Sequence, residues 1–287
     1  MKYGQLGKTG IEVSRLCVGC LSFGQPFSDS HMWTLNPEET ETIVRKALDL
    51  GFTFFDTANT YSHGTSEEYL GRAIKNSVSR DKVILATKVY FNEGHLSKKA
   101  IQREIDGSLK RLNTDYVDLY IIHRFDRTTP IEETMEALDG LVKCGKVRAS
   151  GASAMYGYQF YSMQVAAERN GWTKFCSMQN HYNLLYREDE REIIPLCKQE
   201  GVALTPFSPL AAGRLARVEW KSDSPRSQMD RTASQKYDGT QETDYEIVRR
   251  VHETAEKHGA TMTQVAIAWH MAKGMTAPII GATKAKY

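Results

Sequence analysis

Short runs of apolar, often β-branched residues recur along the chain, with polar stretches between them. Six of these runs lie roughly 26 to 35 residues apart from midpoint to midpoint, which is the length of a strand–helix unit. They cover residues 52–55, 83–86, 117–122, 147–149, 176–178 and 202–204. The pattern predicts buried strands that are connected by helices.

The intervening stretches have the periodicity and the start signals of amphipathic helices. One expected helix face consists of Ile101, Ile105, Leu109 and Leu112. A second helix is expected to start at the capping box Asn36-Pro37-Glu38-Glu39 and a third at Thr129-Pro130-Ile131-Glu132, each with proline at the first helical position. The inner face of the second helix is expected to contain Ile43, Ala47 and Leu50. That of the third is expected to contain Met135, Leu138 and Leu141.

Two further apolar runs, at residues 16–18 and 277–280, bring the number of predicted strands to eight. Nearly continuous apolar strands that alternate with amphipathic helices favour a parallel sheet covered by helices, and eight such units are the number in a (β/α)8 TIM barrel. The alternative is a doubly wound open sheet, which is disfavoured because no G-x-G-x-x-G follows any strand. We expect residues 1–287 to form this one domain. A hairpin of residues 3–6 and 11–13 is expected to cover the bottom of the barrel.

Two segments depart from the regular alternation. Residues 210–244 contain few apolar side chains and many Arg, Lys, Ser and Asp, which predicts a long functional loop or disorder. The chain stops at Tyr287, seven residues after the last predicted strand, so the eighth helix, at the C-terminus, is expected to be missing.

Composition excludes several classes of function. The 37 lysines and arginines nearly balance the 35 aspartates and glutamates, for a net charge of +2, so nothing indicates nucleic-acid binding. No apolar run approaches the ~20 residues of a membrane span, and the N-terminus lacks the apolar core of an export signal. Five cysteines, an odd number, indicate reduced thiols. We expect a soluble, cytoplasmic protein that binds neither nucleic acid nor membrane; its oligomeric state stays open.

Side chains with complementary chemistry follow three consecutive predicted strands. Asp56 and Tyr61 follow the second strand, Lys88 the third and His123 the fourth. In a (β/α)8 barrel, the C-terminal ends of the strands form the face that carries the chemistry. Each residue alone has a structural explanation, as a turn former, a packed ring, a solvated charge or a core histidine. Their joint occurrence on one face indicates an active site.

The combination suits the protonation of an oxyanion. A tyrosine with an ordinary pKa of about 10 is a weak acid at neutral pH, and a nearby ammonium such as that of Lys88 is expected to lower this pKa. Asp56 can hold Lys88 through a charged hydrogen bond, and His123 can orient a carbonyl oxygen beside the Tyr61 hydroxyl. Since no side chain donates hydride, carbonyl reduction at this site requires a cofactor.

These residues resemble the aldo-keto reductase superfamily over residues 1 to 287. The motifs that carry the resemblance are Leu6-Gly7-Lys8-Thr9-Gly10, Asp56-Thr57-Ala58-Asn59-Thr60-Tyr61, Lys88, His123 and Phe207-Ser208-Pro209-Leu210. Details are most similar to the bacterial branch that resembles voltage-gated potassium-channel β subunits, namely Ser66-Glu67-Glu68, Ile122-His123-Arg124 and Gln179-Asn180-His181-Tyr182-Asn183. The resemblance implies an NADP(H)-dependent oxidoreductase that reduces small aldehydes or ketones. It assigns Tyr61 as acid/base, Lys88 and Asp56 as its tuning pair, and His123 as the carbonyl orienter.

The resemblance also implies where the cofactor binds. Ser153 and Gln179 match positions that hold the nicotinamide carboxamide, and Phe207 matches the aromatic residue that stacks on the nicotinamide ring. The residues that begin the cofactor-covering loop at 210–244 and contact the pyrophosphate are Ser208, Leu210, Gly213 and Arg214. Those that close the first strand against the cofactor are Gly19 and Cys20.

The adenosine end of the cofactor site departs from the family pattern in part. The 2′-phosphate site matches Gly281, Thr283 and Lys284, with Lys286 as a weaker second cation. Tyr287 stands where a glutamine often meets the adenosine. Near the nicotinamide, Ala154 stands where many members have asparagine, so one amide contact is expected to be lost.

Aromatic residues after the first, third and fourth strands, Trp33, Tyr90, Phe91 and Phe125, could form the wall of an apolar substrate pocket, with rim packing as the alternative. We expect Trp33, Tyr90 and Phe125 to contact substrate. Cys17 and Cys20 have the spacing of a redox or zinc pair, but no second pair follows, so no metal site is expected. Two alternative functions remain: an NADP(H)-sensing regulatory subunit with little turnover, and a metal-dependent hydrolase or lyase that uses Asp56 and His123.

Overall fold

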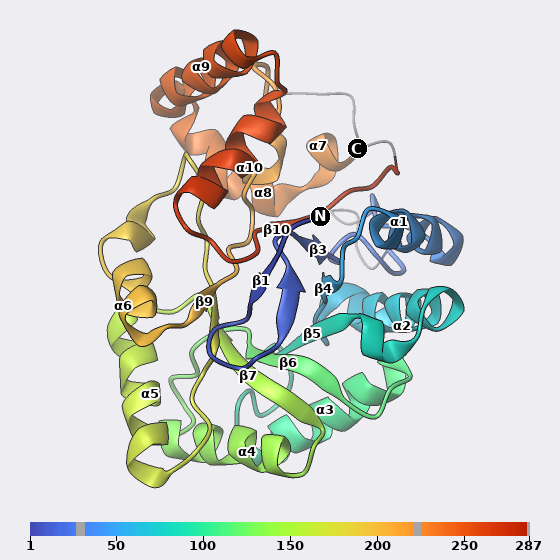
Figure 1. Ribbon diagram of the computed structural model, residues 1–287, viewed down its shortest axis with the longest axis vertical. Helices are drawn as coiled ribbons and strands as arrows, with labels where there is room; N and C mark the ends of the chain where they lie inside the picture. Colours follow the sequence, from blue (N-terminus) through green and yellow to red (C-terminus); the bar gives the residue numbers. More distant parts are fainter. Residues whose placement is uncertain (27–31, 221–224, 286–287) are drawn as a thin grey trace.

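The computed structural model describes residues 1–26, 32–220 and 225–285 of the chain. At its centre, eight parallel strands pair in the order β10-β3-β4-β5-β6-β7-β8-β9 (Figure 1). They are β3 Cys17–Gly19, β4 Phe54–Asp56, β5 Ile84–Val89, β6 Val117–Ile122, β7 Val147–Ser153, β8 Ser177–Gln179, β9 Ala203–Leu204 and β10 Ile279–Ile280. All eight predicted strands are present, with ends that differ by a few residues.

Hydrogen bonds between the two edges of this sheet close it. The backbone N–H of Thr276 donates to the carbonyl of Leu204 at 2.8 Å, and that of Ile279 donates to the carbonyl of Pro206 at 2.9 Å. The last strand therefore lies between β9 and β3. The predicted (β/α)8 barrel is confirmed, and the doubly wound alternative is wrong.

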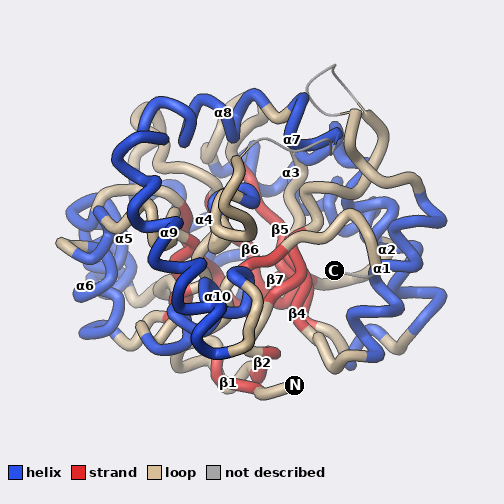
Figure 2. The backbone as a smooth tube through the Cα atoms, turned by 90° about the horizontal axis from the view of Figure 1, so that it is seen from above, coloured by secondary structure: helices blue, strands red, loops and turns tan. Residues whose placement is uncertain are grey.

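Helices surround the strands, as the view from above shows (Figure 2). The helices that follow β3 to β8 are α1 Pro37–Asp49, α2 Thr65–Ser77, α3 Lys98–Leu112, α4 Ile131–Lys143, α5 Gly157–Asn170 and α6 Ile193–Glu200. The helices between β9 and β10 are α7 Pro225–Met229, α8 Arg231–Tyr237, α9 Gln241–His258 and α10 Met262–Ala272. The apolar stripe predicted on α3 is buried against the strands. The segment is helical because a helix places these regularly spaced apolar residues on one face toward the barrel.

Two details of the predicted helices are wrong. At α1 the capping box of Asn36 and Glu39 forms as expected, but Leu50 ends the helix and is 53% exposed instead of lying on the inner face. At α4 no side chain caps the helix. The Thr129 hydroxyl donates instead to Asp126, because that buried carboxylate collects donors from the connection before α4.

The hairpin of β1 Tyr3–Gln5 and β2 Glu12–Ser14 covers the bottom of the barrel, as predicted. Its apolar residues Leu6, Ile11 and Val13 join Phe54 and Leu119 in a separate core cluster inside the barrel. Gly7 in the turn has a φ of +60°, and a Cβ there would lie 2.6 Å from the carbonyl oxygen of Cys176. Only glycine combines this conformation with so close an approach.

The segment 210–244 is not the irregular loop that its composition predicts. Within its described residues it forms α7, α8 and the start of α9, with short 3₁₀ turns at Ala211–Gly213 and Asp238–Thr240. Buried Ala211, Leu215, Trp220 and Tyr237 pack with α9 and α10 in a third core cluster. Leu215, Trp220 and Tyr237 are large, so a few residues bury enough apolar surface to hold this segment in place although it contains few apolar residues.

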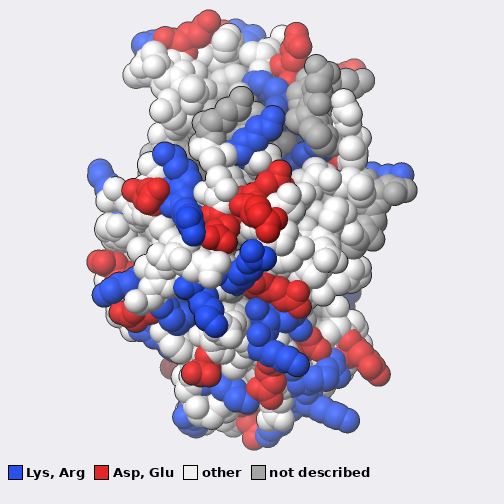
Figure 3. All heavy atoms as spheres, turned by 90° about the vertical axis from the view of Figure 1, so that its right-hand side faces the viewer, with Lys and Arg blue, Asp and Glu red and all other residues white. Residues whose placement is uncertain are grey.

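The described part of the chain ends at residue 285, shortly after β10. Residues 281–285 contain no helix, while Lys286 and Tyr287 lie outside the described residues. Among the helices described, none has the length and apolar character needed to cross a membrane. On the face of the molecule shown in Figure 3, side chains of both charge signs are interspersed, in keeping with the balanced composition.

Candidate active site

The four side chains predicted to be catalytic project from neighbouring strands at one end of the barrel. Asp56 is the last residue of β4, Lys88 lies near the end of β5, and His123 directly follows β6. Tyr61 begins a short 3₁₀ turn after β4, Tyr61–Gly64, whose irregular backbone leads directly into α2. Because these parallel strands end at the same edge of the barrel, their terminal side chains meet.

The ammonium of Lys88 uses all three of its N–H groups inside the protein. Its Nζ lies 2.6 Å from Oδ2 of Asp56, 2.7 Å from the carbonyl oxygen of Thr57 and 3.0 Å from Oη of Tyr61. Lys88 is fully buried and Asp56 nearly so. Since an ammonium has no lone pair, Tyr61 accepts this hydrogen bond, which leaves its own O–H proton to donate elsewhere.

Burial and charge act in opposite directions on these pKa values. Burial raises the pKa of Tyr61, and the Lys88 charge opposes that shift without cancelling it. The expected net lowering of the Tyr61 pKa is therefore wrong for the protein alone, although Lys88 acts in the predicted direction. Burial lowers the pKa of Lys88, but the carboxylate charge of Asp56 and the hydrogen bonds that Asp56 and Tyr61 accept outweigh it and raise this pKa above its ordinary value. Tyr61 is therefore protonated and Lys88 charged at neutral pH.

His123 stands beside Tyr61 as a neutral imidazole. The two rings meet edge to face with centroids 5.8 Å apart. Burial, together with the charges of Lys88 and Arg124, lowers the pKa of His123 well below its ordinary value. Its Nδ1 is buried without a hydrogen-bond partner. A neutral imidazole keeps one N–H and can donate it to an oxygen that also meets Tyr61.

The ends of β7 and β8 continue the site around the barrel. Gln179, the last residue of β8, donates from Nε2 to Oδ1 of Asp56 at 2.8 Å, so the second carboxylate oxygen is also satisfied. Ser153 ends β7 and is buried next to it, because Ser153 and Gln179 are paired in the sheet. The carbonyl oxygen of the Gln179 amide is left available to accept a hydrogen bond from a ligand.

Phe207 lies in a stack of rings after β9. His181 stacks on Phe207 with centroids 5.1 Å apart and on Tyr186 at 4.3 Å. The Nε2 of His181 is 2.7 Å from the hydroxyl of Tyr237, at the end of α8. The Lys236 ammonium lies 4.8 Å from the centroid of the Phe207 ring. These contacts fasten α8 over the C-terminal end of the barrel, opposite the hairpin (Figure 2).

Four of the other residues predicted to bind the cofactor lie in the segment that follows β9. Ser208 and Gly213 have positive φ angles, which turn the chain sharply after β9. Arg214 is buried, pairs with Asp238 and lies over Tyr237, so its side chain holds this segment together. The same turn contains Leu210, which is partly buried against the third core cluster.

The first and last strands of the barrel carry the remaining predicted cofactor residues. A Cβ on Gly19 would lie 2.8 Å from Cγ2 of Ile279, so this glycine permits close packing of β3 and β10. Cys20 is fully buried, and its N–H donates to the carbonyl of Asp56. After β10, Gly281 and Lys284 are exposed and Thr283 is partly buried.

The predicted substrate residues lie against other side chains. Tyr90 stacks on His95 at 4.9 Å, Phe125 packs against the main core, and Trp33 is buried with Arg226 over its ring at 4.4 Å. Besides Tyr61, the aromatic residue that contacts the His123 ring is Phe91, with centroids 5.0 Å apart, and Phe91 is 51% exposed. Phe91 is thus the aromatic rim residue nearest the predicted carbonyl orienter.

Three residues that connect α8 to the barrel were not among the predicted site residues. His181 and Asn183 both contact the Tyr237 hydroxyl, and Lys236 covers Phe207. The first two belong to the run Gln179-Asn180-His181-Tyr182-Asn183, so the motif was a signal for them. Lys236 had no such signal, because its position depends on how α8 folds back over the barrel.

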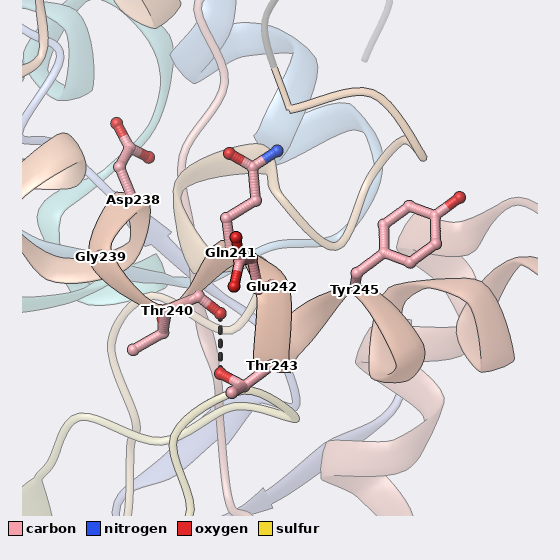
Figure 4. A pocket seen from close by; sticks show the side chains of 7 residues that line it. All are labelled: Asp238, Gly239, Thr240, Gln241, Glu242, Thr243 and Tyr245. Carbon is pink, nitrogen blue, oxygen red and sulfur yellow. Dashed lines mark hydrogen bonds between the residues drawn. The ribbon is translucent and has the colours of Figure 1, made fainter.

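A cavity of about 850 Å³ lies away from these residues, at the turn between α8 and α9 (Figure 4). Residues 238–243 and Tyr245 line it. Polar groups there bond to one another: the hydroxyl of Thr243 donates to the carbonyl of Thr240, whose own hydroxyl bonds to Asp244. None of the predicted site residues lines this cavity. In the described parts of the chain, no cluster of three or more His, Cys, Asp or Glu side chains is arranged to hold a metal ion.

The sequence pattern of the aldo/keto reductase family matches residues 15–287, and the chain belongs to that family. Among its relatives, a versiconal hemiacetal acetate reductase of Aspergillus parasiticus is 42% identical over 98% of this chain and 88% of the relative. A putative aryl-alcohol dehydrogenase of Schizosaccharomyces pombe is 40% identical over 98% of this chain and 88% of its own. An aldo-keto reductase of Alternaria alternata is 41% identical, over 97% and 83%.

The family and the names of these relatives support an oxidoreductase, in agreement with the resemblance seen in the motifs. The three relatives are fungal proteins. The finer likeness to the bacterial branch related to channel β subunits stays a prediction.

Proposed function

We propose that the protein reduces aldehydes or ketones to alcohols with NADPH, and that Tyr61 is the general acid. The observation that carries this proposal is the saturation of Lys88. All three N–H groups of its ammonium are used, one of them by the Tyr61 oxygen, so the phenolic proton faces away from Lys88. A substrate oxygen is the natural acceptor of that proton.

The side chains divide the work on the carbonyl group as follows. The neutral imidazole of His123 donates its N–H to the carbonyl oxygen and holds it beside the Tyr61 hydroxyl. Tyr61 transfers its proton to that oxygen, and the Lys88 charge stabilises the phenolate that remains. Asp56, which is bonded to both Lys88 and Gln179, keeps the ammonium in place. Reduced nicotinamide, when bound, supplies the hydride that the carbonyl carbon needs.

The chain's residues fit such a cofactor at both of its ends. Gln179 has its amide nitrogen bonded to Asp56, so its oxygen is free to accept from a primary amide such as the nicotinamide carboxamide. Phe207 offers a partly exposed flat ring beside it. At the far end, exposed Lys284 is suited to bind a 2′-phosphate. The alternative of a regulatory subunit with little turnover is not favoured, because the relatives are named as reductases and dehydrogenases.

The Tyr61→Phe variant tests the proposal, since it removes the hydroxyl and keeps the ring. We expect carbonyl reduction to fall by about 10²-fold or more, the usual contribution of a general acid. The dissociation constant of NADPH, measured by fluorescence titration, should barely change. Tyr158→Phe is the matched control because Tyr158 is 62% exposed on α5. If Tyr61→Phe keeps more than half of the wild-type turnover with hydride transfer rate-limiting, the acid is a different group.

A further inference from the structure

Arg124 places a cation at the rim of the candidate active site. It directly follows His123 at the end of β6, and its Nη1 donates to the carbonyl oxygen of His123 at 3.3 Å. Its guanidinium carbon lies 5.9 Å from the centroid of the Phe91 ring, the same ring that contacts the His123 imidazole edge-on. The guanidinium is therefore beside the group that is proposed to orient the carbonyl.

Lys236 brings a second cation to the same mouth from a distant part of the chain. It lies on α8, and its ammonium is 4.8 Å from the centroid of the Phe207 ring. Phe207 stacks on His181, and both Arg124 and Lys236 are close enough to lower the pKa of His181, after the larger effect of burial. Desolvation of its ammonium lowers the pKa of Lys236, and the Arg124 charge adds to this shift, so the two positive charges act on each other.

Among the residues that the structure describes, no carboxylate neutralises this pair. Across residues 1–26, 32–220 and 225–285, neither Arg124 nor Lys236 forms an ion pair within 4.0 Å. The nearest acidic influence on Lys236 comes from Asp230, whose carboxylate is already bound to Arg226 at 3.1 Å and caps α8 through the N–H of Ala233. His123 and His181 are both neutral at pH 7. Two neighbouring positive charges with no counterion among the described residues attract an anion.

We propose that Arg124 and Lys236 form an anion-binding pair at the mouth of the active site, and that it selects carbonyl substrates bearing a carboxylate. The inference rests on the proposed function and deepens it. A guanidinium binds a carboxylate through two parallel hydrogen bonds, and Lys236 adds a point charge from α8. A phosphate of the cofactor has the same charge, but Arg124 is anchored to His123, on the substrate side of the site.

Two aldehydes of nearly equal shape test the pair: 4-carboxybenzaldehyde, which is anionic, and 4-nitrobenzaldehyde, which is neutral. The quantity measured is the ratio of their KM values in the wild type and in Arg124→Met and Lys236→Met. We expect Arg124→Met to shift this ratio against the carboxylate by about 10-fold, the usual effect of a charge-assisted hydrogen bond. Lys236→Met should shift it several-fold, because Lys236 is exposed and screened by salt. Arg127→Met, which removes an exposed cation of the same connection, should leave the ratio unchanged.

Binding measured without turnover separates this inference from the proposed function. Benzoate, compared with uncharged benzamide, should bind to wild-type protein in titration calorimetry and lose affinity in Arg124→Met. If benzoate binds in this way but neither aldehyde is reduced, the anion pair stands and the proposed reduction of these aldehydes fails. If both aldehydes are reduced and the KM ratio is the same in all variants, the anion pair is wrong. A weaker NADPH affinity with an unchanged ratio would assign the pair to the cofactor and overturn the inference.

Discussion

Replacing Asp56 by asparagine should cost far more stability than the loss of one ordinary hydrogen bond. The side chains of Lys88 and Asp56 are 0% and 4% exposed, and their charged atoms are 2.6 Å apart. Asparagine keeps the size of the side chain but leaves the ammonium without an opposite charge. The other two hydrogen-bond acceptors of the Lys88 ammonium, the Thr57 carbonyl and the Tyr61 hydroxyl, are uncharged. Removing one partner of a buried ion pair costs about 3–5 kcal/mol, and we expect a decrease of that size in the free energy of unfolding.

A double variant separates the charge effect from simple loss of packing. In Asp56→Asn combined with Lys88→Met, neither charge is left buried, so the desolvation cost of both ions disappears. We expect the double variant to be more stable than Asp56→Asn alone, although it carries one substitution more. Urea unfolding followed by circular dichroism at pH 7 measures the four free energies of the cycle. Strictly additive losses in the two single variants would refute the reasoning, because they would mean that the charges do not depend on each other.

The same variant should show a characteristic pH dependence. Without Asp56, burial lowers the pKa of Lys88 in the folded state, while the unfolded chain keeps its ordinary lysine pKa. The unfolded state then binds more protons, so stability rises with pH. We expect the deficit of Asp56→Asn relative to wild type to shrink as the pH rises from neutral toward the ordinary lysine pKa of about 10.4. A constant deficit over this range would indicate that Lys88 stays charged.

Three further predictions concern other parts of the molecule. Burial lowers the pKa of His270 from 6.5 to about 4, although interaction with the Pro209 carbonyl partly opposes this shift. Between these two pKa values the unfolded chain binds one more proton than the folded protein. Acidification across this range should therefore reduce the free energy of unfolding by up to about 3 kcal/mol. His270→Gln should flatten this slope in denaturation curves. Gly7→Ala should lower the free energy of unfolding by about 1–3 kcal/mol, and Gly10→Ala should lower it less, because a Cβ on Gly10 meets nothing within 4 Å. Equal decreases in the two variants would exclude the predicted clash of the Gly7 Cβ with the Cys176 carbonyl. Lys284→Met should raise the dissociation constant of NADPH and spare that of NADH; equal effects would assign the 2′-phosphate to another cation, such as Arg226.

The sequence alone determined the barrel and the positions of the candidate catalytic groups. Apolar runs at strand–helix spacing specify parallel strands, and parallel strands all end at one edge. Asp56, Lys88 and His123 were therefore predictable as neighbours from their places at the strand ends. The inner face of α3 was predictable for a similar reason, because a helix period is a local property of the chain.

Tertiary structure decided whatever depends on contacts between distant segments. Leu50 is exposed and Thr129 turns to Asp126 because packing and hydrogen-bond partners nearby outweigh local signals. The net pKa shift of Tyr61 follows from burial, which no spacing of residues reveals. Lys236 reaches Phe207 only because α8 folds back across the barrel. Local sequence specifies periodicity and strand ends, whereas electric charge and desolvation depend on every group nearby in space.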